Sequence, residues 1–133
     1  MIRKIIATEL IVRDMATCKA FYRDTLGLQM TQDEPDAVAF KIGDLYFFLL
    51  SATEAGNMIG GQSLRFSFEG TSRSLHAASV DDVDAMYADL KAKGVNVLEP
   101  PTDQPWGLRT AFFTDPEGNF WEINQPVVSK AGA

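Results

Sequence analysis

Apolar and polar residues alternate along the first half of the chain in patterns typical of strands and one helix. Residues 4–12 are rich in Ile, Leu and Val, which favours a strand. Asp14 stands where a helix cap belongs, and apolar residues over 15–26 recur at helical spacing up to Gly27, which can end a helix in the left-handed conformation. Three short strands are expected next: 28–32, 38–42 and 45–51.

The second half of the chain repeats this order. The phrase Val12-x-Asp14 returns 68 residues later as Val80-x-Asp82, and Gly27 at the helix end returns 67 residues later as Gly94. Matching offsets at a helix start and a helix end indicate a tandem duplication. We expect a helix over 83–93. The strands expected in this half are 63–69, 95–98, 108–114 and 120–124.

The stretch 70–79 allows two interpretations. It is either an insertion between the strand 63–69 and the second helix, with a short helical turn over 74–78, or part of it is the opening strand of the second half. The offset of 68 residues permits the second interpretation, and both stay open.

A chain of 133 residues suits a single domain. We expect an α+β fold of two tandem βαβββ modules, one over about 1–60 and the other over about 61–126, with a short tail at 127–133. Each twisted sheet carries a helix on its outer face and must bury its inner face. Pairing two such sheets, within or between chains, produces a concave, barrel-like trough, and small-molecule sites favour such concavities.

Charge and cysteine content narrow the possible partners and the compartment. The formal net charge of −6 disfavours binding to nucleic acid or to an anionic membrane surface. It suits a cationic ligand, although an acidic surface also serves solubility alone. Cys18 is the single cysteine, so no internal disulfide forms and a reducing, cytoplasmic location is expected. The apolar run after Arg3 and Lys4 is interrupted by Glu9, and is too short for a signal peptide or a membrane span.

Phrases at opposite ends of the chain resemble the vicinal oxygen chelate superfamily, which includes glyoxalase I and the bleomycin-resistance proteins. The opening phrase is VRDM at 12–15, followed by FY at 21–22 and LGL at 26–28. The closing phrase is DPEGNFWEI at 115–123, which resembles the last hairpin of these proteins. In that hairpin Pro116 presets the turn, Gly118 tolerates positive φ and Asp115 can bond back to turn amides. The resemblance implies the glyoxalase/bleomycin-resistance fold over nearly the whole chain.

The resemblance also locates four metal-ligand positions, usually His and Glu in the metal-using members, one on each of four strands. Here they fall on these residues: Ala7, Phe48 (or Leu50), Arg65 (or Leu75) and Glu122. Only Glu122 matches, whereas zinc needs about three protein ligands. No metal and no cofactor are therefore expected. His76 adjoins the Leu75 position, but a shift of one residue in a strand turns a side chain to the other face, and we expect His76 on the surface.

Glu9 and Glu122 are the candidate catalytic residues. Glu9 has the strand parity of Ala7, so it is expected to face the trough near Glu122. Three roles are open for the two carboxylates: a displaced metal site, a proton-transfer pair, or an acidic surface that binds a cationic ligand. In the fourth alternative, Glu9 is solvated or ion-paired. Whether the protein is an enzyme stays undecided.

The phrase QPWGLR at 104–109 resembles the bleomycin-resistance branch, whose members bind a bulky, cationic aromatic antibiotic in grooves of a dimer without chemistry. We expect at least half of the strand aromatics to fill the core, whereas Trp106, in a Pro-rich loop, is the best ring for a ligand. Arg109 is expected to meet a carboxylate or to pair with Glu122. The ligand-binding candidates are Phe40, Phe48, Phe66, Trp106, Arg109, Phe113 and Glu122.

Together these features predict a metal-independent, homodimeric protein that binds a small molecule and sequesters an antibiotic or a toxic metabolite. The alternative is a metal-dependent lyase, isomerase or dioxygenase resembling glyoxalase I (lactoylglutathione lyase). A third hypothesis is a metal-free enzyme that uses Glu9 or Glu122 as a general base.

Overall fold

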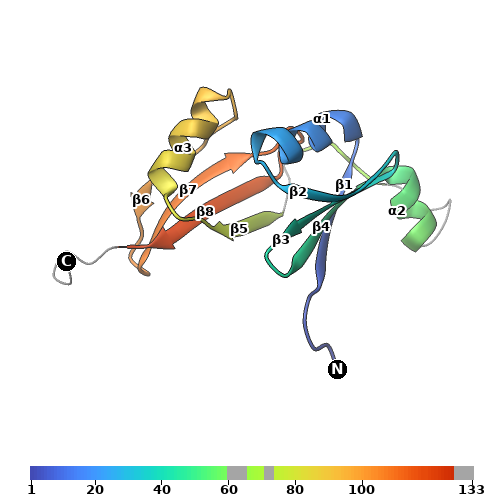
Figure 1. Cartoon of the computed structure of the whole chain (residues 1–133), viewed down its shortest axis with the longest axis horizontal. Helices are drawn as coiled ribbons and strands as arrows, with labels where there is room; N and C mark the ends of the chain where they lie inside the picture. The colour runs from blue at the N-terminus through green and yellow to red at the C-terminus, as the bar shows by residue number, and fades with distance from the viewer. Residues whose placement is uncertain (60–65, 71–73, 128–133) are drawn as a thin grey trace. The chain divides into compact units, whose positions relative to one another are not determined.

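A computed structural model describes residues 1–59, 66–70 and 74–127. The chain divides into two compact units, Met1–Gly70 and Thr71–Ala133. Each unit contains one four-stranded open sheet and the order strand, helix, three strands (Figure 1). The predicted α+β class and the tandem βαβββ arrangement are therefore confirmed. In the part of the chain that the structure describes, none of the helices has the length and apolar character needed to cross a membrane.

The first unit is built from the four strands and the helix of the predicted repeat, followed by one further helix. Its sheet has the order β1-β4-β3-β2, with β1 parallel to β4 and the remaining neighbours antiparallel. Its elements are β1 (Ala7–Val12), α1 (Met15–Ala20), η1 (Phe21–Thr25), β2 (Gln29–Glu34), β3 (Ala37–Ile42), β4 (Leu45–Ser51) and α2 (Ala52–Ile59).

The first helix begins and ends where local chemistry dictates. Asp14 accepts a hydrogen bond from the backbone N–H of Thr17 at 3.1 Å and another from the Thr17 hydroxyl at 2.7 Å. Gly27 has a φ of +68°, the left-handed conformation that stops the helix. Between these ends the helix changes from α to π geometry at Phe21, a change that apolar spacing alone does not predict.

The core of the first unit lies between this helix and the sheet. Tyr22 is fully buried, and its ring centroid lies 4.9 Å from that of Phe47 and 6.1 Å from that of Phe40. Val38 and Leu49 are buried on the same side of the sheet. Alternate residues of β3 and β4 therefore face the helix, and the residues between them face the opposite side.

The second unit repeats the topology. Its sheet has the order β5-β8-β7-β6, with β5 parallel to β8, and α3 covers one face (Figure 1). Asp82 caps α3 by accepting a hydrogen bond from the Ala85 N–H at 3.0 Å, and Gly94 follows with a φ of +81°. The elements are β5 (Leu75–Ser79), α3 (Val83–Ala92), β6 (Thr102–Asp103), β7 (Leu108–Thr114) and β8 (Phe120–Pro126).

The closing hairpin between β7 and β8 forms as the sequence predicts. Asp115 is buried and accepts hydrogen bonds from the backbone N–H groups of Glu117 and Asn119, both at 2.9 Å. The Asn119 side chain donates a third bond to the same carboxylate at 2.8 Å. Gly118 takes the positive φ, +84°. The turn is thus fixed by the side chains of its own phrase.

Two expected strands of the second half are wrong, and one of the two interpretations of the stretch 70–79 is confirmed. The opening strand is β5 (Leu75–Ser79), so this stretch contains the strand, as the second interpretation has it, and not a helical turn over 74–78. In the expected strand 63–69, residues 66–69 are not in a strand and 63–65 lie outside the described residues. Residues 95–98 form only an isolated bridge between Val97 and Phe113. The strand β6, at Thr102–Asp103, takes that place because its backbone pairs with β7.

Candidate functional site

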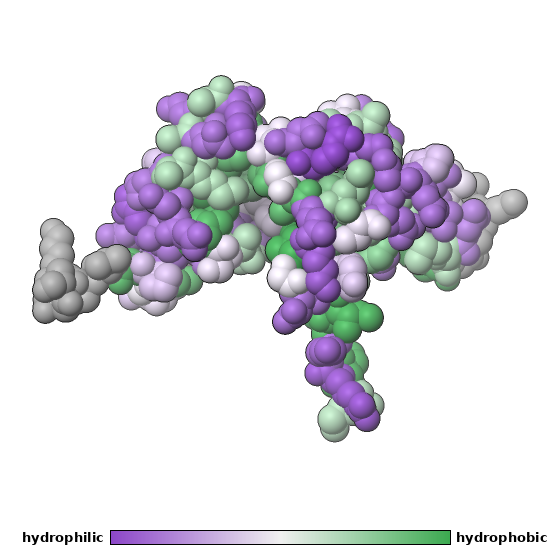
Figure 2. All heavy atoms as spheres, viewed as in Figure 1, coloured by the Kyte–Doolittle hydropathy of each residue, from purple (hydrophilic) through white to green (hydrophobic). Residues whose placement is uncertain are grey.

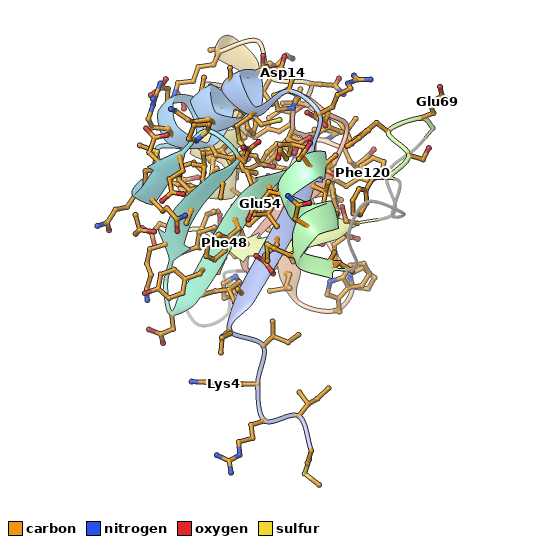
Figure 3. All side chains as sticks on the ribbon, turned by 90° about the vertical axis from the view of Figure 1, so that its right-hand side faces the viewer. Lys4, Asp14, Phe48, Glu54, Glu69 and Phe120 are labelled. Carbon is orange, nitrogen blue, oxygen red and sulfur yellow. The ribbon has the colours of Figure 1, made fainter. Side chains whose placement is uncertain are left out.

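In the first unit, the sheet face opposite α1 brings two aromatic rings and two charges together. Phe47 and Leu49 face the helix, so Tyr46 and Phe48 of β4 face the other way, and Figure 3 labels Phe48 there. Their ring centroids lie 6.4 Å apart at an interplanar angle of 46°. Tyr46 is 41 % exposed, so part of this pair is open to a ligand.

A carboxylate and an ammonium group flank this aromatic pair. Glu9 of β1 is exposed and is the register partner of Phe48. Lys41 of β3 is the register partner of Tyr46, and its Nζ lies 4.2 Å from the centroid of the Tyr46 ring. A ligand ring on Phe48 would therefore meet a negative group on the β1 side and a positive group toward Tyr46. Each stacking or cation–π contact contributes on the order of 0.5–2 kcal/mol.

Of the residues on this face, Phe48 and Glu9 were predicted from the sequence, whereas Tyr46 and Lys41 were not. The signal was present in the strand periodicity, because Tyr46 lies two residues before Phe48 and so shares its face. Lys41 could be placed only once the register of the β3–β4 hairpin was known, since that register makes it the neighbour of Tyr46.

In the second unit, the face opposite α3 is more polar. Glu122 of β8 is half-buried, and its Oε2 accepts a hydrogen bond from the Asn124 Nδ2 at 2.7 Å. Its register partners are Ala77 on β5 and Phe112 on β7. This face thus offers one carboxylate, already oriented by an amide, beside an aromatic ring and a small side chain.

The four metal-ligand positions fall at equivalent places in the two sheets. Ala7 pairs in register with Tyr46, two residues before Phe48, and Leu75 pairs with Phe120, two residues before Glu122. The remaining candidate for the third position, Arg65, lies outside the described residues. Because β5 begins at Leu75, that position carries a hydrocarbon side chain.

These residues do not fit a metal centre. Three of the four positions carry carbon side chains, whereas zinc, nickel or iron need about three or more N, O or S donors. Over the described ranges, no three His, Cys, Asp or Glu side chains come close enough together to hold a metal ion.

His76 lies on β5 and not on an exposed insertion, so its expected surface position is wrong. It faces α3, on the side opposite Glu122, because Ala77 is the register partner of Glu122. Its ring stacks on Trp121, with centroids 4.9 Å apart and an interplanar angle of 27°. Burial lowers the pKa of His76, while the Asp115 charge and a hydrogen bond with the Phe120 backbone act in the opposite direction. His76 is part of the core face of this unit.

The predicted aromatic residues separate into core and surface positions. Phe40 and Phe113 are 0 % and 2 % exposed on the helix-facing sides of their sheets, so they belong to the cores of their units. Phe66 is half-buried and lies outside any strand. Trp106 is 67 % exposed in the turn before β7, where the Gly107 N–H donates to the Gln104 carbonyl at 3.1 Å. Phe48, Phe66 and Trp106 are therefore the ring candidates with exposed surface.

Of the two expectations for Arg109, the pairing with a carboxylate is confirmed, but its partners are Asp84 and Asp103 and not Glu122. Its Nε and one terminal nitrogen donate to the two carboxylate oxygens of Asp84 on α3, both at 2.8 Å, and the other terminal nitrogen donates to Asp103 at 2.9 Å. The hydrogen bonds from Arg109 lower the pKa of Asp84. The physical reason is strand parity, because Arg109 shares the helix-facing side of β7 with Phe113, whereas Glu122 faces away from α3. Arg109 is a structural clamp between α3, β6 and β7.

Comparison with known proteins places this geometry in a family context. Residues 4–123 match the family model described as the Glyoxalase/Bleomycin resistance protein/Dioxygenase superfamily. The chain is 33 % identical over 123 residues to the uncharacterized protein YraH of Bacillus subtilis, covering 90 % of this chain and 96 % of YraH.

Two solved structures are similar over nearly the full length. TnmS3, an antibiotic binding protein from Streptomyces sp. CB03234, is 30 % identical with a TM-score of 0.70, covering 95 % of this chain and 98 % of TnmS3. A lactoylglutathione lyase from Agrobacterium tumefaciens is 27 % identical with a TM-score of 0.72, covering 91 % of this chain and 92 % of that one.

Proposed function

We propose that this chain, which belongs to the Glyoxalase/Bleomycin resistance protein/Dioxygenase superfamily, captures an aromatic small molecule without a metal and thereby sequesters an antibiotic or a toxic metabolite. The observation that carries the proposal is the ring pair of Tyr46 and Phe48 with Glu9 beside it, because Phe48 occupies one of the four positions that the family resemblance assigns to metal ligands. The likeness to the antibiotic binding protein TnmS3 supports it.

The proposal includes the setting in which the protein works. A lone, buried cysteine suits a reducing compartment, so we assign the protein to the cytoplasm. The resemblance to the bleomycin-resistance branch favours a homodimer. The proposed ligand is a small molecule, because the net charge of −6 disfavours binding to nucleic acid and to anionic membrane surfaces.

Ligand capture predicts stabilisation by planar cationic rings. We expect 9-aminoacridine to raise the melting temperature, with a gain of about 2.7 kcal/mol in the free energy of unfolding at a concentration one hundred times Kd. Acridine-9-carboxylate and a non-aromatic amine serve as comparison ligands of different charge and shape. No stabilisation by any aromatic member at saturating concentration would count against the proposal.

Two substitutions test whether the ligand binds to the open face of the first sheet. Phe48→Ala and Glu9→Gln should each weaken the binding of 9-aminoacridine by about 2- to 30-fold, as expected for the loss of one ring or charge contact. Glu69→Gln removes an exposed carboxylate of the same unit outside this face and serves as the matched control. Equal losses in all three variants would assign binding to net charge and not to this face.

A metal-dependent lyase is the second candidate, because the lactoylglutathione lyase neighbour and Glu122 favour it. Elemental analysis of the purified protein separates the two candidates, since stoichiometric nickel, zinc or iron supports the lyase. A metal-free enzyme is the third candidate. In that case Glu9→Gln or Glu122→Gln should abolish turnover while leaving ligand binding intact.

A further inference from the structure

The two charges on the open face of the first sheet lie diagonally across the ring pair of Tyr46 and Phe48. Glu9 lies on β1 beside Phe48, and Lys41 lies on β3 beside Tyr46. The strands β1 and β3 are both neighbours of β4, one on each side. A negative and a positive group therefore stand on opposite sides and at opposite ends of the same pair of rings.

The other two positions around the rings carry small side chains. Ala7 is the register partner of Tyr46 on β1, and Ala39 is the register partner of Phe48 on β3. Neither methyl group can make a hydrogen bond or an ion pair. The polar contacts that strand register places next to the rings are therefore those of the two charged side chains.

Within residues 1–59, 66–70 and 74–127, neither Glu9 nor Lys41 forms an ion pair. Gln29, the register partner of Lys41 on the edge strand β2, is uncharged. By contrast, Lys19 and Arg23 of the same unit pair with carboxylates at 2.8 Å. The open face thus keeps one carboxylate and one ammonium group for a ligand.

Two further cations of this unit, Arg3 and Lys4, lie before the sheet begins. They belong to the segment that precedes β1, where Figure 2 shows hydrophilic and hydrophobic residues alternating. Figure 3 labels Lys4 on this segment, which extends beyond the start of β1. Lys41 is therefore the cation that strand register places beside the rings.

Tyr46 holds the Lys41 ammonium group in place. The Nζ atom lies 4.2 Å from the centroid of the Tyr46 ring, and the electron-rich face of such a ring attracts a cation. A lysine side chain that is already restrained loses less conformational entropy when it binds an anion. Because the ammonium group covers the Tyr46 ring, the half-buried Phe48 is the surface on which a ligand ring can stack.

We propose that Lys41 selects an aromatic zwitterion, whose planar ring stacks on Phe48 while its cationic end lies at Glu9. The anionic group of the ligand, such as a carboxylate, then binds the Lys41 ammonium. Two strand spacings and a shift of two residues separate the Cα atoms of Glu9 and Lys41 by roughly 12 Å, a span that a ligand of about three fused rings can bridge. This inference rests on the proposed capture of an aromatic ligand on the same face, and it adds the second charge that the ligand carries.

Two dyes with the same planar cationic ring system test this selection. Tetramethylrhodamine carries a carboxylate and is zwitterionic at neutral pH, whereas its methyl ester is only cationic. Fluorescence anisotropy should show that the protein binds the zwitterion about 2- to 5-fold more tightly than the ester. That gain is expected from one ion pair at a partly exposed site.

Variants then test whether Lys41 causes the preference. Lys41→Met keeps the length of the side chain and should remove the preference by weakening the binding of the zwitterion, whereas Lys41→Arg keeps the charge and should retain it. Glu9→Gln should weaken both dyes alike, because both carry the cationic ring system. Lys91→Met removes an exposed ammonium group from α3 and is the matched control for the change in net charge.

The outcomes separate this inference from the proposed capture of an aromatic cation. Equal affinities of the two dyes for the unmodified protein overturn the inference and leave the capture standing. A preference that persists in Lys41→Met, or that Lys91→Met removes equally, overturns it as well. If neither dye binds, the inference is wrong, and the binding of 9-aminoacridine then shows whether the capture fails with it.

Discussion

At the residue scale, His76 is the side chain whose environment gives a direct pH prediction. Burial lowers its pKa from the ordinary value of 6.5, because stacking against Trp121 excludes water from the charged form. As the pH falls below about 6.5, the imidazole of the unfolded chain takes up a proton while that of the folded chain stays neutral. The unfolded state then binds more protons, so the free energy of unfolding should decrease until the pH passes the folded pKa.

The measurement is simple because the chain has a single histidine. One imidazole signal in a proton NMR titration should show a midpoint below 6.5. A His76→Phe variant, which keeps an aromatic ring against Trp121, should lose this part of the pH dependence of urea unfolding. A midpoint at or above 6.5 would contradict the buried, stacked position.

The alternation of a strand predicts which face of the sheet each side chain occupies, but it does not predict the ion-pair partner of that side chain. The alternation of β7 places Arg109 on the side of Phe113 and away from Glu122 once the strand is recognised. Asp84, however, belongs to a helix 25 residues earlier. Only the packing of α3 on the sheet brings its carboxylate within 2.8 Å of the guanidinium group. A pairing of this kind depends on tertiary structure, and no local pattern indicates it.

At the element scale, the two faces of the first sheet should respond differently to the same substitution. Phe40→Ala removes a fully buried ring packed near Tyr22, and we expect a loss of about 3–5 kcal/mol in the free energy of unfolding. Phe48→Ala removes a half-buried ring on the open face and should cost clearly less stability. Urea unfolding of both variants measures this. Equal losses would mean that the open face is as tightly packed as the core.

The cap of α3 gives a second prediction at this scale. Asp82→Ala removes the side-chain acceptor for the Ala85 N–H and should cost about 1 kcal/mol. Asp82→Asn retains an oxygen acceptor and should recover most of that loss. Thermal unfolding of the three proteins checks the order, and an Asn variant as unstable as the Ala variant would indicate a role other than capping.

The elements that the sequence predicted correctly are those with local signals. The caps Asp14 and Asp82 and the left-handed Gly27 and Gly94 fix both helices within a residue or two at most positions, because their chemistry acts within one turn. The strand β5 was missed as the main interpretation because its sequence, LHAAS, has no clear alternation of apolar and polar residues. It is a strand because β8 pairs with it in parallel, and that partner lies about 45 residues away in the sequence.

At the scale of the whole molecule, the duplication organises the chemistry. In the first sheet Ala7 lies diagonally across from Phe48 on the neighbouring strand, and in the second sheet Leu75 lies in the same way across from Glu122. The four positions that the resemblance assigns to metal ligands are therefore equivalent in the two sheets, and three of them carry hydrocarbon side chains. The resemblance located these positions from the sequence, and the observed register shows that they are geometrically equivalent. The chemical character of the open face of the first sheet depends on side chains that the duplication does not specify, such as Tyr46 and Lys41.

The net charge of −6 is also a property of the whole molecule, and it separates two explanations of the acidic composition. If the negative field attracts a cationic ligand, the association rate of 9-aminoacridine should fall severalfold between 10 mM and 500 mM NaCl, because screening shortens the range of the field from about 30 Å to a few ångströms. Stopped-flow quenching of tryptophan fluorescence measures this rate, and an uncharged ring should show no such dependence. If both ligands respond alike, the acidic residues serve solubility, and the contacts at Tyr46, Phe48 and Glu9 alone select the ligand.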